Sequence, residues 1–275
     1  MTFLDSLLEA GRRNHSLLCV GLDPDARKLP AILRSASDPT YAFCMSIVEA
    51  TADLVCAFKP NIAFFEALGP AGIETLRRLI ADMPRNVPVL LDAKRGDMGS
   101  TAEAYAAAIF ERLGADAVTL NPYLGSDSLA PFLRHVDKGC IVVCKTSNPG
   151  SAELQELELA KGGPLYLEVA RRARDDWNAN GNLGLVVGAT YPGVLAQVRA
   201  LCHDLPLLVP GVGAQGGELT AATRASIDSH GERAIISASR SILYAGDSAD
   251  FPDAARQEAL RLRAEINAAI GENKI

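Results

Sequence analysis

The residues of this sequence best suited to chemistry are three charged side chains that follow the apolar run Val89-Leu90-Leu91. They are Asp92, Lys94 and Asp97, within Asp92-Ala93-Lys94-Arg95-Gly96-Asp97. Side chains alternate along a strand, so Asp92 and Lys94 are expected to point to the same side. Charges at the end of a buried strand are costly unless they compensate one another. A lysine held between carboxylates can stabilise a developing negative charge and then donate a proton to it.

A purely structural role is the alternative for these charges, because a salt bridge can close one end of a fold. Lys59 ends a neighbouring apolar run, however, and two lysines with two aspartates are more than such closure needs. The histidines lie in or beside predicted helices, so we expect the proton donor among lysines and carboxylates. They are His15, His135, His203 and His230. We therefore predict Lys59, Asp92, Lys94 and Asp97 as the catalytic group.

A second group of residues could bind phosphate. Residues 211–217 (Gly-Val-Gly-Ala-Gln-Gly-Gly) follow the seventh apolar run, and Ser239-Arg240-Ser241 follow the eighth. Glycines let backbone N–H groups approach an anion closely, and Arg240 can add a bidentate contact. Three of the glycines also match a dinucleotide-binding motif, but no acidic residue ends the following strand to hold a ribose hydroxyl. We expect a phosphate site and no NAD.

These residues need a scaffold that gathers the ends of strands. Short apolar runs recur eight times and are separated by stretches of helical periodicity, which is typical of a parallel sheet covered by helices. Nearly every run ends in residues capable of chemistry, and α/β barrels build their active sites at the carboxyl ends of strands. The sequence thus predicts a (β/α)8 TIM barrel, with an open doubly wound sheet as the alternative. The predicted strands are Leu17–Asp23, Val55–Asn61, Val87–Lys94, Ala117–Pro122, Cys140–Ser147, Leu183–Thr190, Leu205–Val212 and Ala234–Ser239.

The sequence between the strands contains helix boundary signals but no break between domains. Asp38-Pro39 predicts an N-cap followed by proline, and Ser100 with Glu103 predicts a capping box. Gly114 is expected to end the second of these helices. The segment 150–163 is the best candidate for a long surface loop or lid. We expect residues 1–275 to form one domain.

Composition narrows the class of protein. A net charge of −6 and a pI near 5.3 argue against nucleic-acid binding, which needs a basic face. No apolar run approaches membrane-spanning length, and the first residues lack the pattern of a signal peptide. The six cysteines show no zinc-binding spacing and are expected to be free core residues. We expect a cytoplasmic enzyme that binds neither nucleic acid nor membrane.

The combination of these motifs resembles the orotidine 5′-phosphate decarboxylase family, in its longer bacterial branch. The likeness extends over nearly the whole chain, through Cys19–Asp23, Phe58–Asn61, Asp92–Asp97, Ser147–Gly150, Gly211–Gly217 and Ser239–Ser241. The Asp-x-Lys-x-x-Asp element is specific when it is combined with the late phosphate loop. The resemblance implies conversion of orotidine 5′-monophosphate to UMP and CO2 without metal or organic cofactor.

The resemblance also assigns roles to single residues. It implies that Lys94 protonates C6, that Asp92 faces the departing carboxyl group, and that Lys59 pairs with Asp92 and reaches the ribose. Asp97 and Thr101 would enter the site of a partner subunit, which implies a homodimer with shared active sites. The remaining implied contacts are with the ribose, the pyrimidine and the phosphate, and they fall on Asp23, Ser147, Gln215, Gly216 and Arg240.

Three other functions remain open at this point. A related sugar-phosphate decarboxylase or aldol-type synthase would depend on magnesium and would need a carboxylate at the end of the second strand, where this chain has Lys59. A Schiff-base aldolase could use Lys94 or Lys145. A catalytically silent nucleotide-binding barrel would leave the complete charged cluster unexplained.

Overall fold

The computed structural model describes residues 1–212 and 218–271, and strands alternate with helices along these ranges. The strands are β1 (Leu18–Leu22), β2 (Ala57–Pro60), β3 (Leu90–Arg95), β4 (Ala117–Leu120), β5 (Gly139–Lys145), β6 (Leu183–Val187), β7 (Leu207–Pro210) and β8 (Ala234–Ala238). Each lies within the predicted range or departs from it by one residue.

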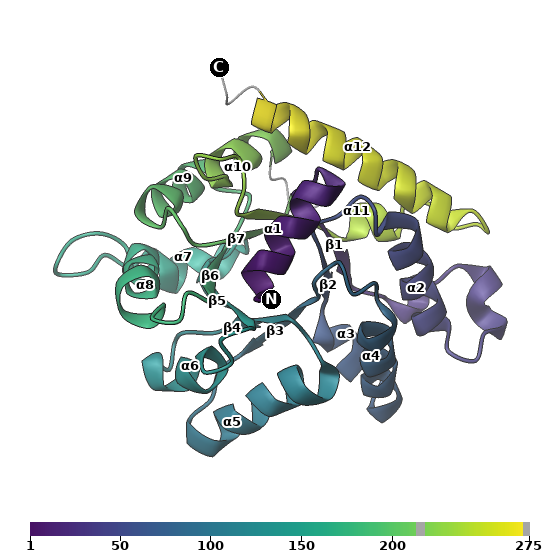
Figure 1. Cartoon of the computed structure of the whole chain (residues 1–275), viewed down its shortest axis with the longest axis horizontal. Coiled ribbons are helices and arrows are strands. Elements are labelled where there is room, and N and C mark those ends of the chain that lie inside the picture. The colour runs from purple at the N-terminus through teal and green to yellow at the C-terminus, as the bar shows by residue number, and fades with distance from the viewer. Residues whose placement is uncertain (213–217, 272–275) are drawn as a thin grey trace.

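The strands are separated by helices that surround the sheet (Figure 1). The α-helices are α1 (Phe3–Asn14), α2 (Pro39–Thr51), α3 (Ile62–Glu66), α4 (Pro70–Asp82), α5 (Gly99–Ala107), α6 (Ser126–Leu133), α7 (Ala152–Gln155), α8 (Leu165–Arg172), α9 (Pro192–Leu201), α10 (Leu219–Ser226), α11 (Arg240–Leu243) and α12 (Phe251–Gly271). Short 3-10 turns are η1 (Ala26–Lys28), η2 (Ala31–Ser35) and η4 (Pro149–Ser151), and π-helical turns η3 (Ala108–Leu113) and η5 (Ala173–Trp177) continue α5 and α8.

The parallel sheet closes on itself. Its hydrogen-bonded order is β2-β1-β8-β7-β6-β5-β4-β3. Parallel bridges from Phe58 to Val89 and from Asn61 to Asp92 then join the two outer strands. The predicted (β/α)8 barrel is therefore confirmed, and the open doubly wound alternative is wrong.

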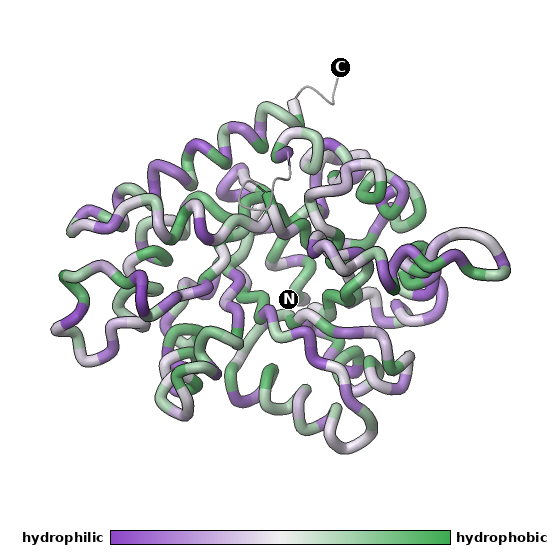
Figure 2. Tube along the Cα trace, turned by 180° about the vertical axis from the view of Figure 1, so that it is seen from behind, coloured by the Kyte–Doolittle hydropathy of each residue, from purple (hydrophilic) through white to green (hydrophobic). Residues whose placement is uncertain are grey.

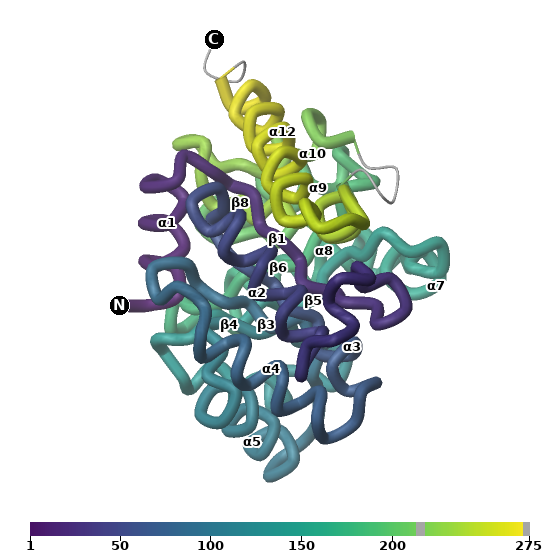
Figure 3. The backbone as a smooth tube through the Cα atoms, turned by 90° about the vertical axis from the view of Figure 1, so that its right-hand side faces the viewer, coloured from purple at the N-terminus to yellow at the C-terminus, as the bar shows by residue number. Residues whose placement is uncertain are grey.

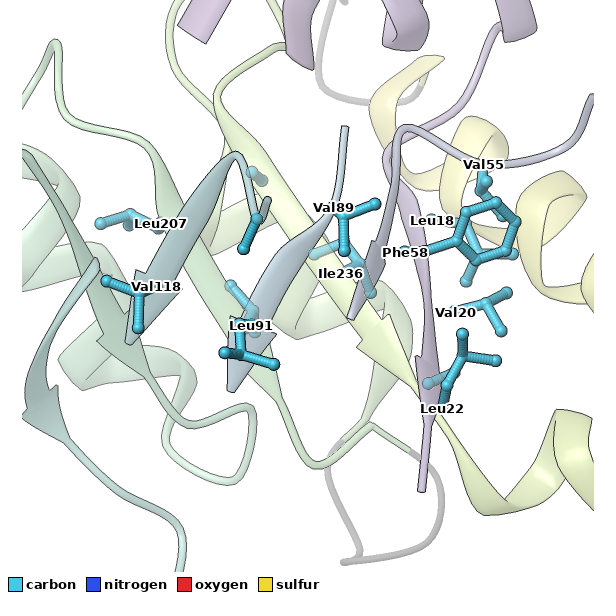
Figure 4. Packing of buried hydrophobic residues seen from close by; sticks show 14 of the residues in the cluster. Leu18, Val20, Leu22, Val55, Phe58, Val89, Leu91, Val118, Leu207 and Ile236 are labelled. Carbon is cyan, nitrogen blue, oxygen red and sulfur yellow. The ribbon is translucent and has the colours of Figure 1, made fainter. Parts of the chain in front are cut away.

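Two apolar layers follow from the alternation of side chains along each strand. One side of β1 presents Leu18, Val20 and Leu22. These side chains pack with other buried side chains on the outer face of the sheet, including Phe58 of β2 (Figure 4). The opposite side of the strands supplies a second cluster, here called the inner cluster. Its members are Phe3, Leu7, Cys19, Cys56, Ala57, Leu90, Ala117, Ile141, Val186, Leu208 and Ile235.

Helix α1 covers the amino-terminal end of the barrel. Phe3 and Leu7 belong to the inner cluster, and a Cβ at Gly139 would lie 2.3 Å from the Phe3 ring, so this contact depends on glycine. Figure 3 places α1 and the segment around α7 at opposite ends of the molecule. The polar ends of the strands therefore open on the side away from α1, where barrel enzymes place their active sites.

Most helix boundary signals act as predicted. The Asp38 side chain accepts a hydrogen bond from the Tyr41 amide, with Pro39 at the first position of α2. Gly114, at φ 78°, ends η3. The capping box at Ser100 is wrong, because α5 begins at Gly99 without a side-chain cap.

The remaining surface of the barrel is covered by amphipathic helices. Hydrophilic and hydrophobic residues alternate along the long helix α12 (Figure 2), and its buried positions include Phe251, Leu262 and Ile266. No described helix combines the length and apolar composition that crossing a membrane requires. The six cysteines are free and buried, as predicted, and burial raises the pKa of each thiol, that of Cys19 to about 12.

Candidate active site

A cavity of about 640 Å³ opens at the carboxyl ends of the strands. Its floor includes Val186 and Leu208 of the inner cluster. Its charged and polar lining contains six of the residues that the sequence analysis singled out, namely Asp23, Lys59, Asp92, Lys94, Ser147 and Arg240. The predicted gathering of these side chains is therefore observed.

Strand alternation explains why three of the lining residues meet at one level. On β2, β3 and β4 the inner cluster is formed by Ala57, Leu90 and Ala117. The residue two positions further along each strand points to the same side, and these residues are Lys59, Asp92 and Thr119. Polar side chains thus lie directly above an apolar layer that excludes water from below.

Asp92 is the centre of this polar level. Its Oδ1 atom lies 2.6 Å from Lys94 Nζ and accepts a hydrogen bond from Thr119 Oγ1 at 2.8 Å. Its Oδ2 atom lies 3.3 Å from Lys59 Nζ. The side chains of Lys59 and Asp92 are 5% and 12% exposed, whereas that of Lys94 is 50% exposed. One carboxylate therefore holds a buried cation on one side and a cation open to the cavity on the other.

The charges stabilise each other in the ionised state. Burial alone would raise the pKa of Asp92, but the charges of Lys59 and Lys94, with hydrogen bonds from Lys94 and Thr119, hold it well below its ordinary value. Burial would lower the pKa of Lys59, but the charges of Asp92 and Asp23 outweigh it and raise that pKa. The cluster therefore remains charged at neutral pH.

Thr119 is a site residue that the sequence analysis missed. Its hydroxyl accepts hydrogen bonds from the backbone N–H groups of Ala93 and Lys94, both at 2.9 Å, and donates to Asp92. Lys94 has a φ of 45°, a left-handed conformation that is uncommon for a residue with a side chain. The same hydroxyl thus contacts the Asp92 carboxylate and supports the unusual backbone at Lys94.

The other predicted contacts lie around the rim of the cavity. Asp23 follows β1, and its Oδ1 atom is buried with no hydrogen-bond partner among residues 1–212 and 218–271. Ser147 follows β5, and Arg240 is the exposed first residue of α11. A buried acceptor without a partner is costly in free energy, so this Asp23 oxygen is suited to accept a hydrogen bond from a bound molecule.

Four predicted site residues do not line this cavity in the described structure. Asp97 is partly buried and accepts a hydrogen bond from the Met98 amide, and Thr101 is exposed on α5. Gln215 and Gly216 lie outside the described residues. Thr146 and Asn148, which the sequence analysis did not select, line the cavity beside Ser147.

Comparison with known proteins decides the family. A family model described as orotidine 5′-phosphate decarboxylase / HUMPS family matches residues 16–251. The chain belongs to this family. The resemblance noted in the sequence is therefore confirmed.

Relatives named orotidine 5′-phosphate decarboxylase cover nearly the whole chain. One from Roseiflexus castenholzii is 57% identical over 98% of this chain and 99% of its own, and one from Ralstonia pickettii is 54% identical over 97% and 98%. The solved structure of Leishmania donovani OMP decarboxylase is 44% identical, with a TM-score of 0.87 over 98% of this chain and 99% of its own. The orotidine 5′-phosphate decarboxylase fold thus extends over the full barrel described above.

Proposed function

We propose that this chain converts orotidine 5′-monophosphate to UMP and CO2, with Lys94 as the proton donor in a charged network of Lys59, Asp92 and Lys94. The observation that carries the proposal is the single carboxylate of Asp92 held between two ammonium groups, 3.3 Å and 2.6 Å away, in the mouth of a barrel of this family. The names of the relatives support the choice of substrate.

The proposed chemistry uses fixed charges alone. The C6 carboxylate of the substrate lies beside Asp92, and breaking the C6–carboxyl bond releases CO2 and leaves the electron pair on C6. The Lys94 ammonium stabilises this carbanion and transfers a proton to C6, which gives UMP, and Lys94 later recovers a proton from solvent. Positioned proton transfer typically contributes about 10²- to 10⁴-fold. Charges arranged before the reaction, which need no reorganisation, supply much of the remainder.

The rim residues hold the parts of the substrate that do not react. Asp23, with its buried oxygen, accepts a hydrogen bond from a ribose hydroxyl. Ser147 contacts the pyrimidine. Arg240 binds the phosphate together with Gln215 and Gly216. Binding energy from the distant phosphate then holds the substrate against the charged network.

We also propose that the enzyme is a homodimer with shared active sites, each chain being one barrel domain over residues 1–275. Asp97 and Thr101 do not line the cavity of their own chain, which suits a role in the partner's site. The loops after β3 and β4 begin side by side, because the Asn121 amide, just after β4, donates a hydrogen bond to the carbonyl of Arg95, the last residue of β3. These loops carry exposed apolar side chains, Met98 at 62%, Tyr123 at 79% and Leu124 at 46%, which a partner could cover.

The magnesium-dependent rivals are disfavoured by one position. They need a carboxylate at the end of the second strand, and β2 presents the Lys59 ammonium there, paired with Asp92. The Schiff-base alternative needs a lysine that can reach a carbonyl substrate. Lys94 lines the cavity, and borohydride trapping with substrate would label it only if that mechanism operated.

The deciding experiment follows the loss of the orotate chromophore of orotidine 5′-monophosphate with EDTA-treated protein. Turnover is expected without added metal. Lys94→Ala should reduce kcat by at least about 10²-fold, because it removes both the proton and its charge. Its unfolding free energy should fall by less than that of an Asp92 variant, because Lys94 is half exposed and Asp92 keeps Lys59 as a partner.

A control variant and two alternative outcomes complete this test. Lys161→Met removes an exposed lysine that pairs with Glu168 and is not part of the charged network, and it should leave kcat unchanged. Turnover that disappears with EDTA and returns with magnesium would favour the metal-dependent rival. No turnover by folded wild-type protein under any of these conditions would favour the silent barrel.

A further inference from the structure

A second lysine is buried beside the cavity without lining it. Lys145 is the last residue of β5, and its side chain is 0% exposed. The pairing of β5 with β6 shifts register between Val143 and Lys145, which interrupts the regular alternation of side chains at this point. As a result, Lys145 contacts the segment that follows β5, residues 146–156, and does not line the cavity.

Two polar side chains of this segment, Ser151 and Glu156, contact the Lys145 ammonium. Its Nζ atom donates to Ser151 Oγ at 2.6 Å and lies 2.9 Å from Glu156 Oε1. The ring of Tyr191, from the loop after β6, lies 4.8 Å from the same nitrogen, within the range of a cation–π contact. A buried ammonium is costly without such compensation. An apolar side chain would fill the same space at a lower cost in free energy. Packing alone therefore does not explain a charged residue at this position.

The same segment is closed by a second set of contacts and forms a wall of the cavity. The Thr146 backbone amide donates to Gln155 Oε1 at 2.8 Å, and Nε2 of the Gln155 side chain donates to Thr146 Oγ1 at 2.9 Å. The first residues of the segment, 146–149, line the cavity and include Ser147. A Cβ at Gly188 of the neighbouring loop would lie 2.9 Å from Ser147, so Ser147 packs closely there. Lys145 and Gln155 thus tie the outer part of the segment to the point where its inner part enters the site.

We propose that Lys145 is a positioning residue that fixes Ser147 and the 146–149 wall through its contacts with Ser151 and Glu156. The inference rests on the proposed function, in which Ser147 contacts the pyrimidine. Lys145 itself touches no substrate. Its effect on the reaction passes through the segment, because a small misplacement of a binding group lowers the rate even when the reacting groups are intact.

The test is a double-mutant cycle on kcat/KM for orotidine 5′-monophosphate. Lys145→Met keeps a side chain of similar length without the charge, and it should lower kcat/KM by about 10- to 100-fold. In the Ser147→Ala background most of this loss should disappear, because residues that act through one another are not additive. A loss of the same factor in both backgrounds would overturn the proposal. The exposed Lys161→Met, on the longer stretch after the same strand, is the matched control.

Two further measurements keep the proposal testable if Lys145→Met folds poorly or if the substrate is different. Glu156→Gln retains an acceptor for the ammonium and changes a residue that is 45% exposed, so it should fold and show a smaller loss in kcat/KM. Amide hydrogen exchange over residues 146–156 should be faster in Lys145→Met and Glu156→Gln than in wild type or Lys161→Met. Unchanged exchange would refute the anchoring role. Faster exchange in a protein without decarboxylase activity would refute the proposed function alone.

Discussion

At the scale of single residues, the site depends on one carboxylate that satisfies two cations. Lys59 is almost fully buried and needs the negative charge of Asp92, whereas Lys94 is half exposed and can turn toward a substrate. Removing Asp92 would therefore leave a buried ammonium without its close partner, which is more costly than removing Lys94. This asymmetry supports the proposal that the Lys59–Asp92 pair stabilises the site and that Lys94 acts on the substrate.

The depressed pKa of Asp92 predicts how stability depends on pH. The pKa of an aspartate in the unfolded chain is about 3.9, and the pKa of Asp92 in the folded protein is lower. Its contribution is therefore fully present above that unfolded pKa and is lost as pH falls through the folded one. A difference of one pH unit between the two pKa values corresponds to about 1.4 kcal/mol.

Asp92→Asn should consequently be less stable than wild type at neutral pH, and its unfolding free energy should fall less on acidification below about pH 4. Urea unfolding at a series of pH values measures both effects. Parallel stability curves for the two proteins would contradict the charge pairing seen around Asp92.

Thr119 allows a sharper test of how the charged residues are held. Thr119→Val removes the hydroxyl but keeps the shape, and it leaves the Ala93 and Lys94 amides without this acceptor. We expect a loss of about 1–3 kcal/mol in unfolding free energy, as for other buried groups left unpaired. We also expect a reduced kcat, with both properties recovered in Thr119→Ser. If the valine and serine variants had equal kcat, the hydroxyl would have no role in positioning.

The sequence is sufficient to predict Asp92, Lys94 and Lys59, because charged residues after apolar runs are conspicuous and strand alternation places them. Thr119 gives no such signal, since threonine is common in strands and its partners are contributed by another strand. The left-handed backbone at Lys94 also gives no signal in the sequence, because it is supported by hydrogen bonds that the Ala93 and Lys94 amides donate to Thr119, a residue of another strand.

At the scale of elements, the proposed function assigns different parts of the substrate to different loops after the strands. Those after β1, β5 and β8 contribute Asp23, Ser147 and Arg240 at the rim, above the charged residues of β2 and β3. Arg240 begins the short helix α11, is exposed and lines the cavity. Its guanidinium is thus available to an anionic group of the substrate.

Arg240→Ala should lower kcat/KM by about 10²-fold or more, since two charge-assisted hydrogen bonds to phosphate contribute about 1.5–3 kcal/mol each. The residue touches no reacting atom, so the loss reflects binding energy used at a distance. Orotidine, which lacks the phosphate, is the matched control substrate. Its slow decarboxylation should be the same in the variant and in wild type. An equal loss with both substrates would show that Arg240 supports the fold of the site instead.

Element boundaries were predictable to different degrees. Asp38-Pro39 fixes its helix start because both the side-chain cap and the proline act locally. The Ser100–Glu103 pattern fails because α5 begins at Gly99, at φ 53°, so that Met98 occupies the N-cap position two residues before Ser100. The segment after β5 was expected as a loop or lid, and its anchoring by Lys145 could not be predicted, since that depends on a register shift between strands.

At the scale of the whole molecule, the barrel follows from eight repeats of one pattern. Each apolar run is too short to be stable alone and buries both faces only when the sheet closes, so the fold could be predicted from periodicity. The surface that contacts a partner subunit could not be predicted in the same way. Exposed Met98, Tyr123 and Leu124 indicate a surface that prefers cover, but surface residues carry no periodic signal for what covers them.

The dimer proposal is tested by mixing two inactive proteins. In a heterodimer of Asp97→Ala and Lys94→Ala subunits, one site combines Lys94 from the first chain with Asp97 from the second and is intact. Random exchange should make half of the dimers mixed, so about a quarter of wild-type activity should return in a two-fold symmetric dimer. Mixing Lys94→Ala with Lys59→Ala is the matched control. Both lesions then lie in the same subunit's half of the site, so every site keeps one defect and no activity should return. If the first mixture also stayed inactive after exchange was verified by differential tagging, each active site would have to lie within a single chain.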